Sequence, residues 1–181
     1  MDEIRLKIGV SACLLGERVR YDAGHKYNSA LLHHLSADYE LLSICPEVAA
    51  GLGVPRPPVQ LMVREGETRA LGVVDEQLDV TLPLVNYGRL LAQELDGVCG
   101  YVFKSRSPSC GLGTTPIRAE AGALHYGNGL FAQQIVQAWP LLPVIDEESL
   151  EQTSLRQQFL QQVAAYGRRL AVNASLDLGR L

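Results

Sequence analysis

The chain has 181 residues, of which 47% are hydrophobic and 20% are charged, proportions typical of a globular protein that buries a core without disulfide bonds. Its formal net charge of −4 argues against a surface that neutralises many phosphates, and so against binding of bulk DNA or RNA. The first residues are acidic and unlike a secretory signal, and no apolar run approaches the roughly 20 residues that span a membrane. We therefore expect a cytoplasmic protein that does not act at a membrane.

The first third of the chain predicts a βαβ unit. Residues 4–10 alternate apolar and polar side chains, which is typical of a strand, and residues 14–24 form a loop. Asn28 is a suitable N-cap for a helix over residues 30–35, and residues 39–44 form a second apolar strand. Strands connected in this way lie parallel, with a right-handed crossover.

The middle of the chain predicts a short helix, a hairpin and a long helix. Pro46 is suited to the first position of a helix that ends near Leu52. Residues 59–74 contain two apolar segments around a polar turn, which indicates a β-hairpin. Thr81 is predicted as the N-cap of a helix over residues 82–95.

The remaining segments complete an alternation of strands and helices. Residues 97–103 form a third, fully apolar strand of the kind found in parallel sheets, and residues 114–129 form a loop with a short hairpin. A helix over residues 130–139 precedes a short strand at residues 141–145 and an amphipathic helix over residues 154–170.

These elements predict the α/β fold class: a single Rossmann-like domain with a mostly parallel sheet, a small β-hairpin insertion and a C-terminal helix. We expect the domain to span residues 1–170. Residues 171–181 carry weak signals and are expected to form a disordered C-terminal tail.

Three of the four cysteines follow predicted strands. Cys13, Cys45 and Cys110 each lie at or just beyond the carboxyl end of a strand, and these ends share one edge in a parallel sheet. Cys99 lies inside a strand and is predicted to be a buried packing residue. Without an export signal, structural disulfides are not expected, so the three thiols are either buried small side chains or groups that bind metal or react.

Three convergent thiolates suit an iron–sulfur cluster better than structural zinc. A structural zinc site has four ligands, often in Cys-x-x-Cys pairs, and the chain has no such pair. His33, His34 and His125 are not adjacent to the three cysteines and are predicted to be ordinary surface or core residues. An iron–sulfur cube usually has four thiolate ligands, so three would leave one iron open as a Lewis acid. A chance placement of three loop cysteines is the alternative.

Polar residues beside the cysteines are candidates for catalysis or binding. Glu47 lies two residues after Cys45, where it either complements the helix dipole or acts as a general acid or base. Ser105, Ser107 and Ser109 precede Cys110, and either bond to a cluster or solvate the loop. Residues that could orient a planar polar ligand, or simply anchor loops, are Arg20, Tyr21, Asp22, Arg56 and Lys104.

Three ordered motifs carry a resemblance to a known family. They are SACLLG with VRYD at residues 11–22, CPEV with GLGVPRP at residues 45–57, and KSRSPSCG at residues 104–111. With GLFA at residues 129–132 and PLLPV at residues 140–144, they resemble the thiouracil desulfurase (TudS) family, a bacterial iron–sulfur family formerly of unknown function. The resemblance covers most of residues 4–170.

The resemblance implies a cofactor, a reaction and a set of ligands. A [4Fe–4S] cluster would be bound by Cys13, Cys45 and Cys110, with the fourth iron free of protein ligands. The substrate would be thiouracil or a related thiopyrimidine, whose sulfur binds this iron. Non-redox desulfuration would give uracil and sulfide.

The resemblance also implies the acid–base residues of the reaction. By motif position these are Glu47 and Ser105, and either Ser107 or Ser109 is close enough in sequence to replace Ser105. Ala23 departs from the family pattern, which has a glycine after the tyrosine–aspartate pair.

The alternative function is a non-catalytic module that binds an iron–sulfur cluster or zinc and acts as a sensor or assembly partner. Such a module needs neither an open coordination position nor a positioned Glu47. The sequence leaves open whether the substrate is free thiouracil, a thionucleoside or another thioamide. It also leaves open the role of Cys99 and the oligomeric state.

Overall fold

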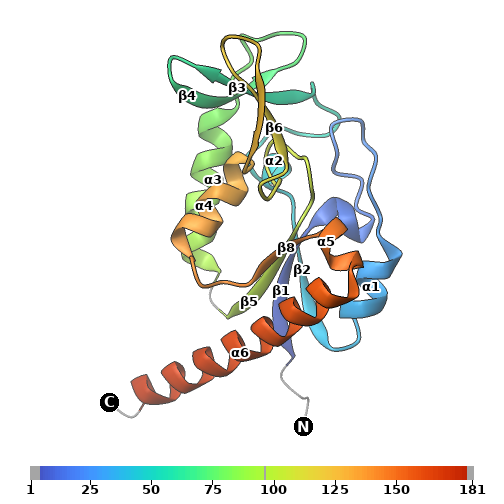
Figure 1. Cartoon of the computed structure of the whole chain (residues 1–181), viewed down its shortest axis with the longest axis vertical. Coiled ribbons are helices and arrows are strands. Elements are labelled where there is room, and N and C mark those ends of the chain that lie inside the picture. The colour runs from blue at the N-terminus through green and yellow to red at the C-terminus, as the bar shows by residue number, and fades with distance from the viewer. Residues whose placement is uncertain (1–4, 96, 179–181) are drawn as a thin grey trace.

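Four parallel strands form the first sheet, sheet A, in a computed structural model that describes residues 5–95 and 97–178 (Figure 1). In spatial order they are β2 (Tyr39–Ile44), β1 (Leu6–Ser11), β5 (Val98–Phe103) and β8 (Val144–Asp146). Every pairing in this sheet is parallel. The predicted α/β fold with a mostly parallel sheet is therefore confirmed.

Helices cover both faces of sheet A. On one face, α1 (Ser29–Leu35) and α6 (Thr153–Leu178) pack against the strands and enclose one apolar core. On the other face, α3 (Thr81–Glu94) and α4 (Leu130–Ala138) enclose a second core. Gly100 lets α6 approach closely, because an added Cβ would lie 2.7 Å from Val163 Cγ2.

A second four-stranded sheet, sheet B, is larger than the predicted hairpin insertion. Its order is β4 (Glu67–Gly72), β3 (Val59–Arg64), β6 (Thr115–Arg118) and β7 (Leu124–Gly127). The two hairpins predicted separately are joined by parallel pairing of β3 with β6. The inner face of sheet B packs on the start of α3, so α3 contributes to the cores of both sheets.

Local capping agrees with the sequence at one helix and differs at another. The Asn28 side chain accepts a hydrogen bond from the Leu31 N–H at 3.0 Å, as expected of an N-cap. The prediction that Thr81 is an N-cap is wrong, since Thr81 is inside α3 and its hydroxyl accepts instead from the Ala70 N–H at 2.9 Å. This side chain ties the helix to sheet B.

Several boundaries differ from those predicted. The short helix α2 (Pro46–Ala49) ends before Leu52. The 3-10 helix η1 (Ala12–Leu15) and the helix α5 (Glu147–Glu151) were not predicted. Helix α6 continues to Leu178, beyond the expected end at residue 170. The predicted start of the first strand at Ile4 and the end of the tail, residues 179–181, lie outside the described residues.

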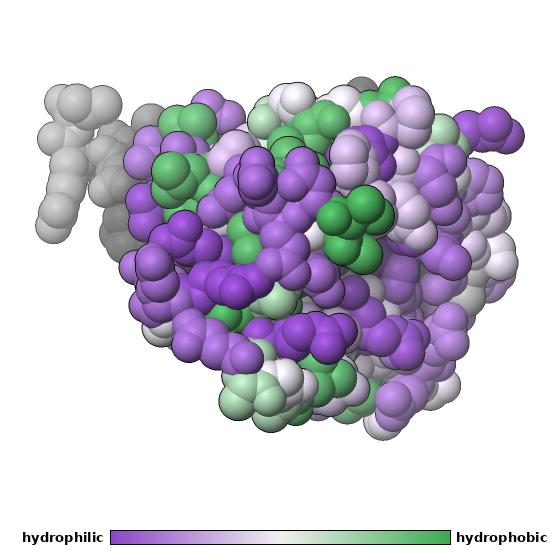
Figure 2. All heavy atoms as spheres, turned by 90° about the horizontal axis from the view of Figure 1, so that it is seen from above, coloured by the Kyte–Doolittle hydropathy of each residue, from purple (hydrophilic) through white to green (hydrophobic). Residues whose placement is uncertain are grey.

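The surface carries scattered apolar groups. Figure 2 looks onto the sheet B end of the molecule and shows hydrophobic side chains in separate small patches among hydrophilic ones. Within the part of the chain that the structure describes, no helix combines the length and hydropathy needed to cross a membrane.

Candidate active site

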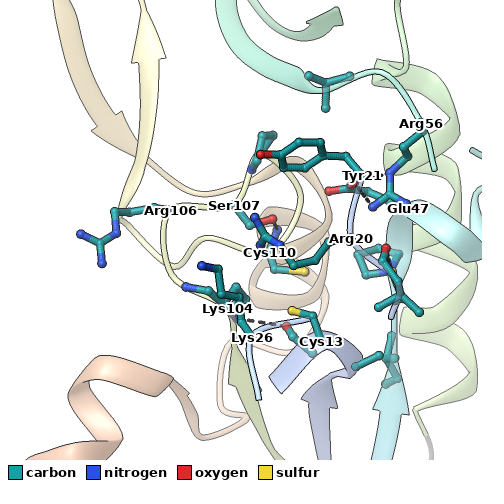
Figure 3. Close-up of a pocket in the computed structure, with 18 of the residues that line it drawn as sticks. Cys13, Arg20, Tyr21, Lys26, Glu47, Arg56, Lys104, Arg106, Ser107 and Cys110 are labelled. Atoms are coloured by element: carbon teal, nitrogen blue, oxygen red, sulfur yellow. Dashed lines mark hydrogen bonds and ion pairs between the residues drawn. The ribbon is translucent and has the colours of Figure 1, made fainter. Parts of the chain in front are cut away.

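Cys13, Cys45 and Cys110 line one pocket of about 480 Å³. They follow β1, β2 and β5, which are neighbours in sheet A, so the three strand ends lie along one edge. Figure 3 shows the sulfur atoms of Cys13 and Cys110 directed toward the same cavity. The three cysteines therefore lie around one pocket at the edge of the sheet that their positions after predicted strands indicated.

Burial raises the pKa values of all three thiols. The pKa of the Cys13 thiol rises to about 11, and those of the Cys45 and Cys110 thiols are raised as well. A thiolate in such surroundings needs a cationic partner, and bound metal provides one. These thiols would therefore lose their protons on binding metal.

The type of donor at the pocket, thiol sulfur, is the one that iron–sulfur clusters use. Over residues 5–95 and 97–178, no three His, Cys, Asp or Glu side chains are arranged to hold a single metal ion. A cluster places each cysteine on its own iron, so its ligands spread more widely than those of zinc. Three cysteines around one pocket provide three such donors.

The Tyr101 hydroxyl is a second observation that fits a bound group. Tyr101 lies on β5, is fully buried, and belongs to the same core as Cys110. Its oxygen has no hydrogen-bond partner, whereas every other buried side-chain nitrogen or oxygen of the described residues has one. Burial, and then Cys110, raise its pKa well above the ordinary value, and Cys45 and Cys13 act in the same direction. Because buried hydroxyls are rarely unpaired, this oxygen and the three cysteines fit a group bound close by, although Tyr101 itself is not part of the pocket lining.

Glu47 is held in the pocket wall by two partners. The Arg56 guanidinium forms an ion pair with Glu47 Oε2, with Nε at 2.8 Å. The Ser109 hydroxyl donates to Glu47 Oε1 at 2.7 Å. Ser107 Oγ lies 3.0 Å from Ser109 Oγ and accepts from the Cys110 N–H at 3.1 Å. The carboxylate is thus anchored through both oxygens, by residues from two different motifs.

Ser105 has a different carboxylate partner, Glu147. The Ser105 N–H donates to Glu147 Oε2 at 2.6 Å, and its hydroxyl donates to Oε1 at 2.8 Å. The Lys104 ammonium forms an ion pair with the same carboxylate. Glu47 and Ser105, which were predicted to act together, are therefore held by separate hydrogen-bond networks.

The loop that carries Cys110 is bonded to the start of α4. The Leu130 and Ala132 N–H groups donate to the carbonyls of Pro108 and Ser109, each at 3.0 Å. An added Cβ on Gly129 would lie 2.5 Å from the Ser109 carbonyl oxygen. The loop therefore provides acceptors for the first turn of the helix, and glycine allows the close approach.

Most of the predicted ligand-orienting residues reach the pocket. Arg20, Tyr21, Arg56 and Lys104 line it, and the Arg20 guanidinium lies 5.4 Å from the centre of the Tyr21 ring. Asp22 is not part of the lining and instead accepts from the Gly24 N–H at 2.9 Å. Ala23 has φ +57°, a left-handed conformation that explains why a glycine is expected there.

Other predicted residues lie away from the pocket. Cys99 is buried in the core between sheet A and α6, as predicted. His33 and His34 are in α1 and His125 is in β7, and none of them lines the pocket.

The sequence analysis missed two groups of site residues. Lys26, Pro58 and Val59 line the pocket, although nothing in their sequence context indicates it. Glu147 was also missed, but a signal existed, because it directly follows the fourth strand of sheet A in the same way that the cysteines follow the other three.

Comparison with known proteins identifies the family. The family model for 2-thiouracil desulfurase matches residues 8–147. The chain is 30% identical over 135 residues to the uncharacterized protein YbbK of Bacillus subtilis (strain 168), an alignment that covers 71% of this chain and 89% of YbbK. It is 34% identical to a solved structure described as a [4Fe–4S]-dependent thiouracil desulfidase, TudS (DUF523Vcz), with a TM-score of 0.66 and coverage of 85% of this chain and 99% of that one. This chain therefore belongs to the 2-thiouracil desulfurase family.

Proposed function

We propose that this protein is a [4Fe–4S]-dependent enzyme that removes sulfur from thiouracil or a related thiopyrimidine. The reaction consumes one water, replaces the C=S group by C=O and releases hydrogen sulfide, without an oxidant or reductant. One observation carries the proposal: the three motif cysteines and an anchored glutamate line the same pocket. Membership of the family supports the choice of substrate.

Cys13, Cys45 and Cys110 are the residues that would hold the cluster. When bound, the cluster would provide an iron without a protein ligand, a Lewis acid that attracts the substrate sulfur and weakens the C–S bond. All other steps depend on side chains of this chain.

Glu47 is the proposed general base. Its carboxylate would accept a proton from the water that attacks the thiocarbonyl carbon. Arg56 and Ser109 fix the orientation of the carboxylate, and the guanidinium compensates its charge. Ser105, which lines another part of the pocket, is the proposed second acid–base residue, and its hydroxyl oxygen would act as the acceptor for a ring proton of the substrate.

The first experiment measures iron, acid-labile sulfide and zinc per chain after anaerobic reconstitution. We expect about four irons and four sulfides in the wild type and a loss of both in Cys13→Ser. Cys99→Ser is the matched control, since Cys99 is buried outside the pocket and should leave the iron content unchanged. Zinc in place of iron would contradict the cluster assignment.

The second experiment measures uracil and sulfide released from 2-thiouracil, with a thionucleoside tested in parallel. Glu47→Gln should keep the cluster and lose turnover, because an amide cannot accept the proton from water. Full activity in this variant would exclude Glu47 as the base. A fully loaded wild type that releases no sulfide from either compound would favour the non-catalytic binding module.

A further inference from the structure

Glu147 is a buried carboxylate with a dense set of donors. Its side chain is 7% exposed and that of its partner Lys104 is 14% exposed. It accepts hydrogen bonds from the Ser105 N–H, the Ser105 hydroxyl and the Lys104 ammonium. Glu147 directly follows the end of β8 and is the first residue of α5. Asp146 is the N-cap of this helix, and the Asp146 side chain accepts a hydrogen bond from the Ser149 N–H at 2.8 Å. The reaction described above gives Glu147 no role.

This network fixes the direction of the hydrogen bonds at Ser105. An ionised carboxylate can only accept, so the Ser105 hydroxyl proton is committed to Glu147. Lys104 Nζ donates to Ser105 Oγ at 3.0 Å and fills one of its two lone pairs. The hydroxyl therefore retains one lone pair and no free proton.

Lys104 is also committed to the protein. Its ammonium group has three hydrogens, and three acceptors surround it: the Ser105 carbonyl at 3.1 Å, Ser105 Oγ and Glu147 Oε1. Both residues line the pocket, yet neither has a free donor to offer a ligand. The hydrogen-bonding capacity left on these two side chains is a single acceptor, the second lone pair of Ser105 Oγ.

We propose that Glu147 is a positioning residue that holds Ser105 as a hydrogen-bond acceptor for a ring N–H beside the thiocarbonyl group of the substrate. This inference rests on the proposed function. In 2-thiouracil, an N–H flanks the C=S group on each side. The pocket would therefore select cyclic thioamides that carry such an N–H over those alkylated at that nitrogen. A site built around a hydrogen bond rejects analogues that lack the partner group.

Glu148 provides a matched control in the next position of the chain. It forms an ion pair with Arg106 in which both side chains are exposed, and in the described structure its side chain makes no hydrogen bond to Ser105. Glu148→Gln removes the same charge from the first turn of the same helix without changing the hydrogen bonds at Ser105. In Glu147→Gln, the new amide can donate to Ser105 Oγ, which frees the hydroxyl proton to point into the pocket.

The test is calorimetric binding of uracil, 1-methyluracil and 3-methyluracil, which keep the ring but undergo no turnover, to the cluster-loaded protein. The wild type should bind uracil roughly tenfold more tightly than at least one of the two methyl derivatives. Glu147→Gln should reduce that ratio to about twofold or less, because a donor replaces the acceptor. Glu148→Gln should retain the wild-type ratio.

Three outcomes would overturn the inference. The first is equal binding of all three compounds by the wild type, and the second is an unchanged ratio of uracil to methyluracil affinity in Glu147→Gln, which would indicate steric exclusion of the methyl group. The third is loss of this ratio in Glu148→Gln as well. If Glu147→Gln does not fold or bind iron, Ser105→Ala replaces it, with the same loss of discrimination expected.

Sulfide release from 2-thiouracil is measured on the same preparations. Release with no effect of Glu147 on the ratio contradicts the role of Glu147 alone. A Glu147-dependent ratio without sulfide release contradicts the desulfurase function alone.

Discussion

Replacing Arg56 by methionine should destabilise the protein strongly, because it leaves the Glu47 carboxylate buried without its partner. The Arg56 and Glu47 side chains are only 6% and 13% exposed, so the pair is largely removed from water. Removing one member of a buried pair costs about 3–5 kcal/mol, and the remaining exposure of Glu47 places the expected loss at the lower end of this range, about 3 kcal/mol. Arg56 also donates to the Gly53 carbonyl at 2.8 Å, a bond that methionine cannot replace.

The pair formed by Arg64 and Glu76 is the control. Its side chains are 45% and 49% exposed, so Arg64→Met should cost at most about 0.5 kcal/mol. Both variants are measured by anaerobic urea unfolding, followed by far-UV circular dichroism. The double variant Arg56→Met with Glu47→Leu should recover part of the lost stability, since no charge remains buried. A loss in Arg56→Met no larger than in Arg64→Met would refute this account of the site.

Three further substitutions test features near the pocket. Tyr101→Phe should stabilise the cluster-free protein by about 1 kcal/mol in urea unfolding, because it removes an unpaired buried hydroxyl. In the cluster-loaded protein it should speed the loss of iron to a chelator, and equal effects of Tyr166→Phe would contradict this account. Ala23→Gly should raise the free energy of unfolding by roughly 0.5–1 kcal/mol, since it relieves a left-handed alanine, and a decrease would count against that strain. Gly129→Ala should lower stability by about 1–3 kcal/mol and reduce iron content, because its Cβ would collide with the Ser109 carbonyl; normal iron content would show that the loop adjusts without cost.

Sheet A and the meeting of the cysteines were predictable because they follow from local patterns and one topological rule. Apolar segments separated by helices indicate parallel strands, and parallel strands place their carboxyl ends together. These two rules were enough to place Cys13, Cys45 and Cys110 at one edge of the sheet. The burial of Cys99 followed equally well from its place inside a strand.

The parts that were missed depend on contacts between distant segments. β3 and β6 pair over only Leu61 with Ile117 and Met62 with Arg118, so neither hairpin shows in its own sequence that it belongs to a larger sheet. Threonine is a common N-cap residue, but the Thr81 hydroxyl accepts a hydrogen bond from the Ala70 N–H instead of from an N–H of its own helix.

The serines beside Cys110 show the same limit at the site. Sequence spacing cannot tell that Ser109 contacts Glu47 while Ser105 contacts Glu147, because both carboxylates come from other strand ends. The family pattern indicated a segment that does line the pocket, but it could not indicate which partner each hydroxyl has.

The bonds between the Cys110 loop and α4 make two backbone amides observable reporters of the site. The Leu130 and Ala132 amide protons are held by the Pro108 and Ser109 carbonyls, so they can exchange with solvent only when the loop separates from the helix or the helix end frays. Their deuterium uptake would therefore measure how far the cysteine loop is ordered before any metal is added. Comparing uptake before and after cluster assembly would show whether the apo chain already holds the loop in its binding geometry or acquires it with the iron.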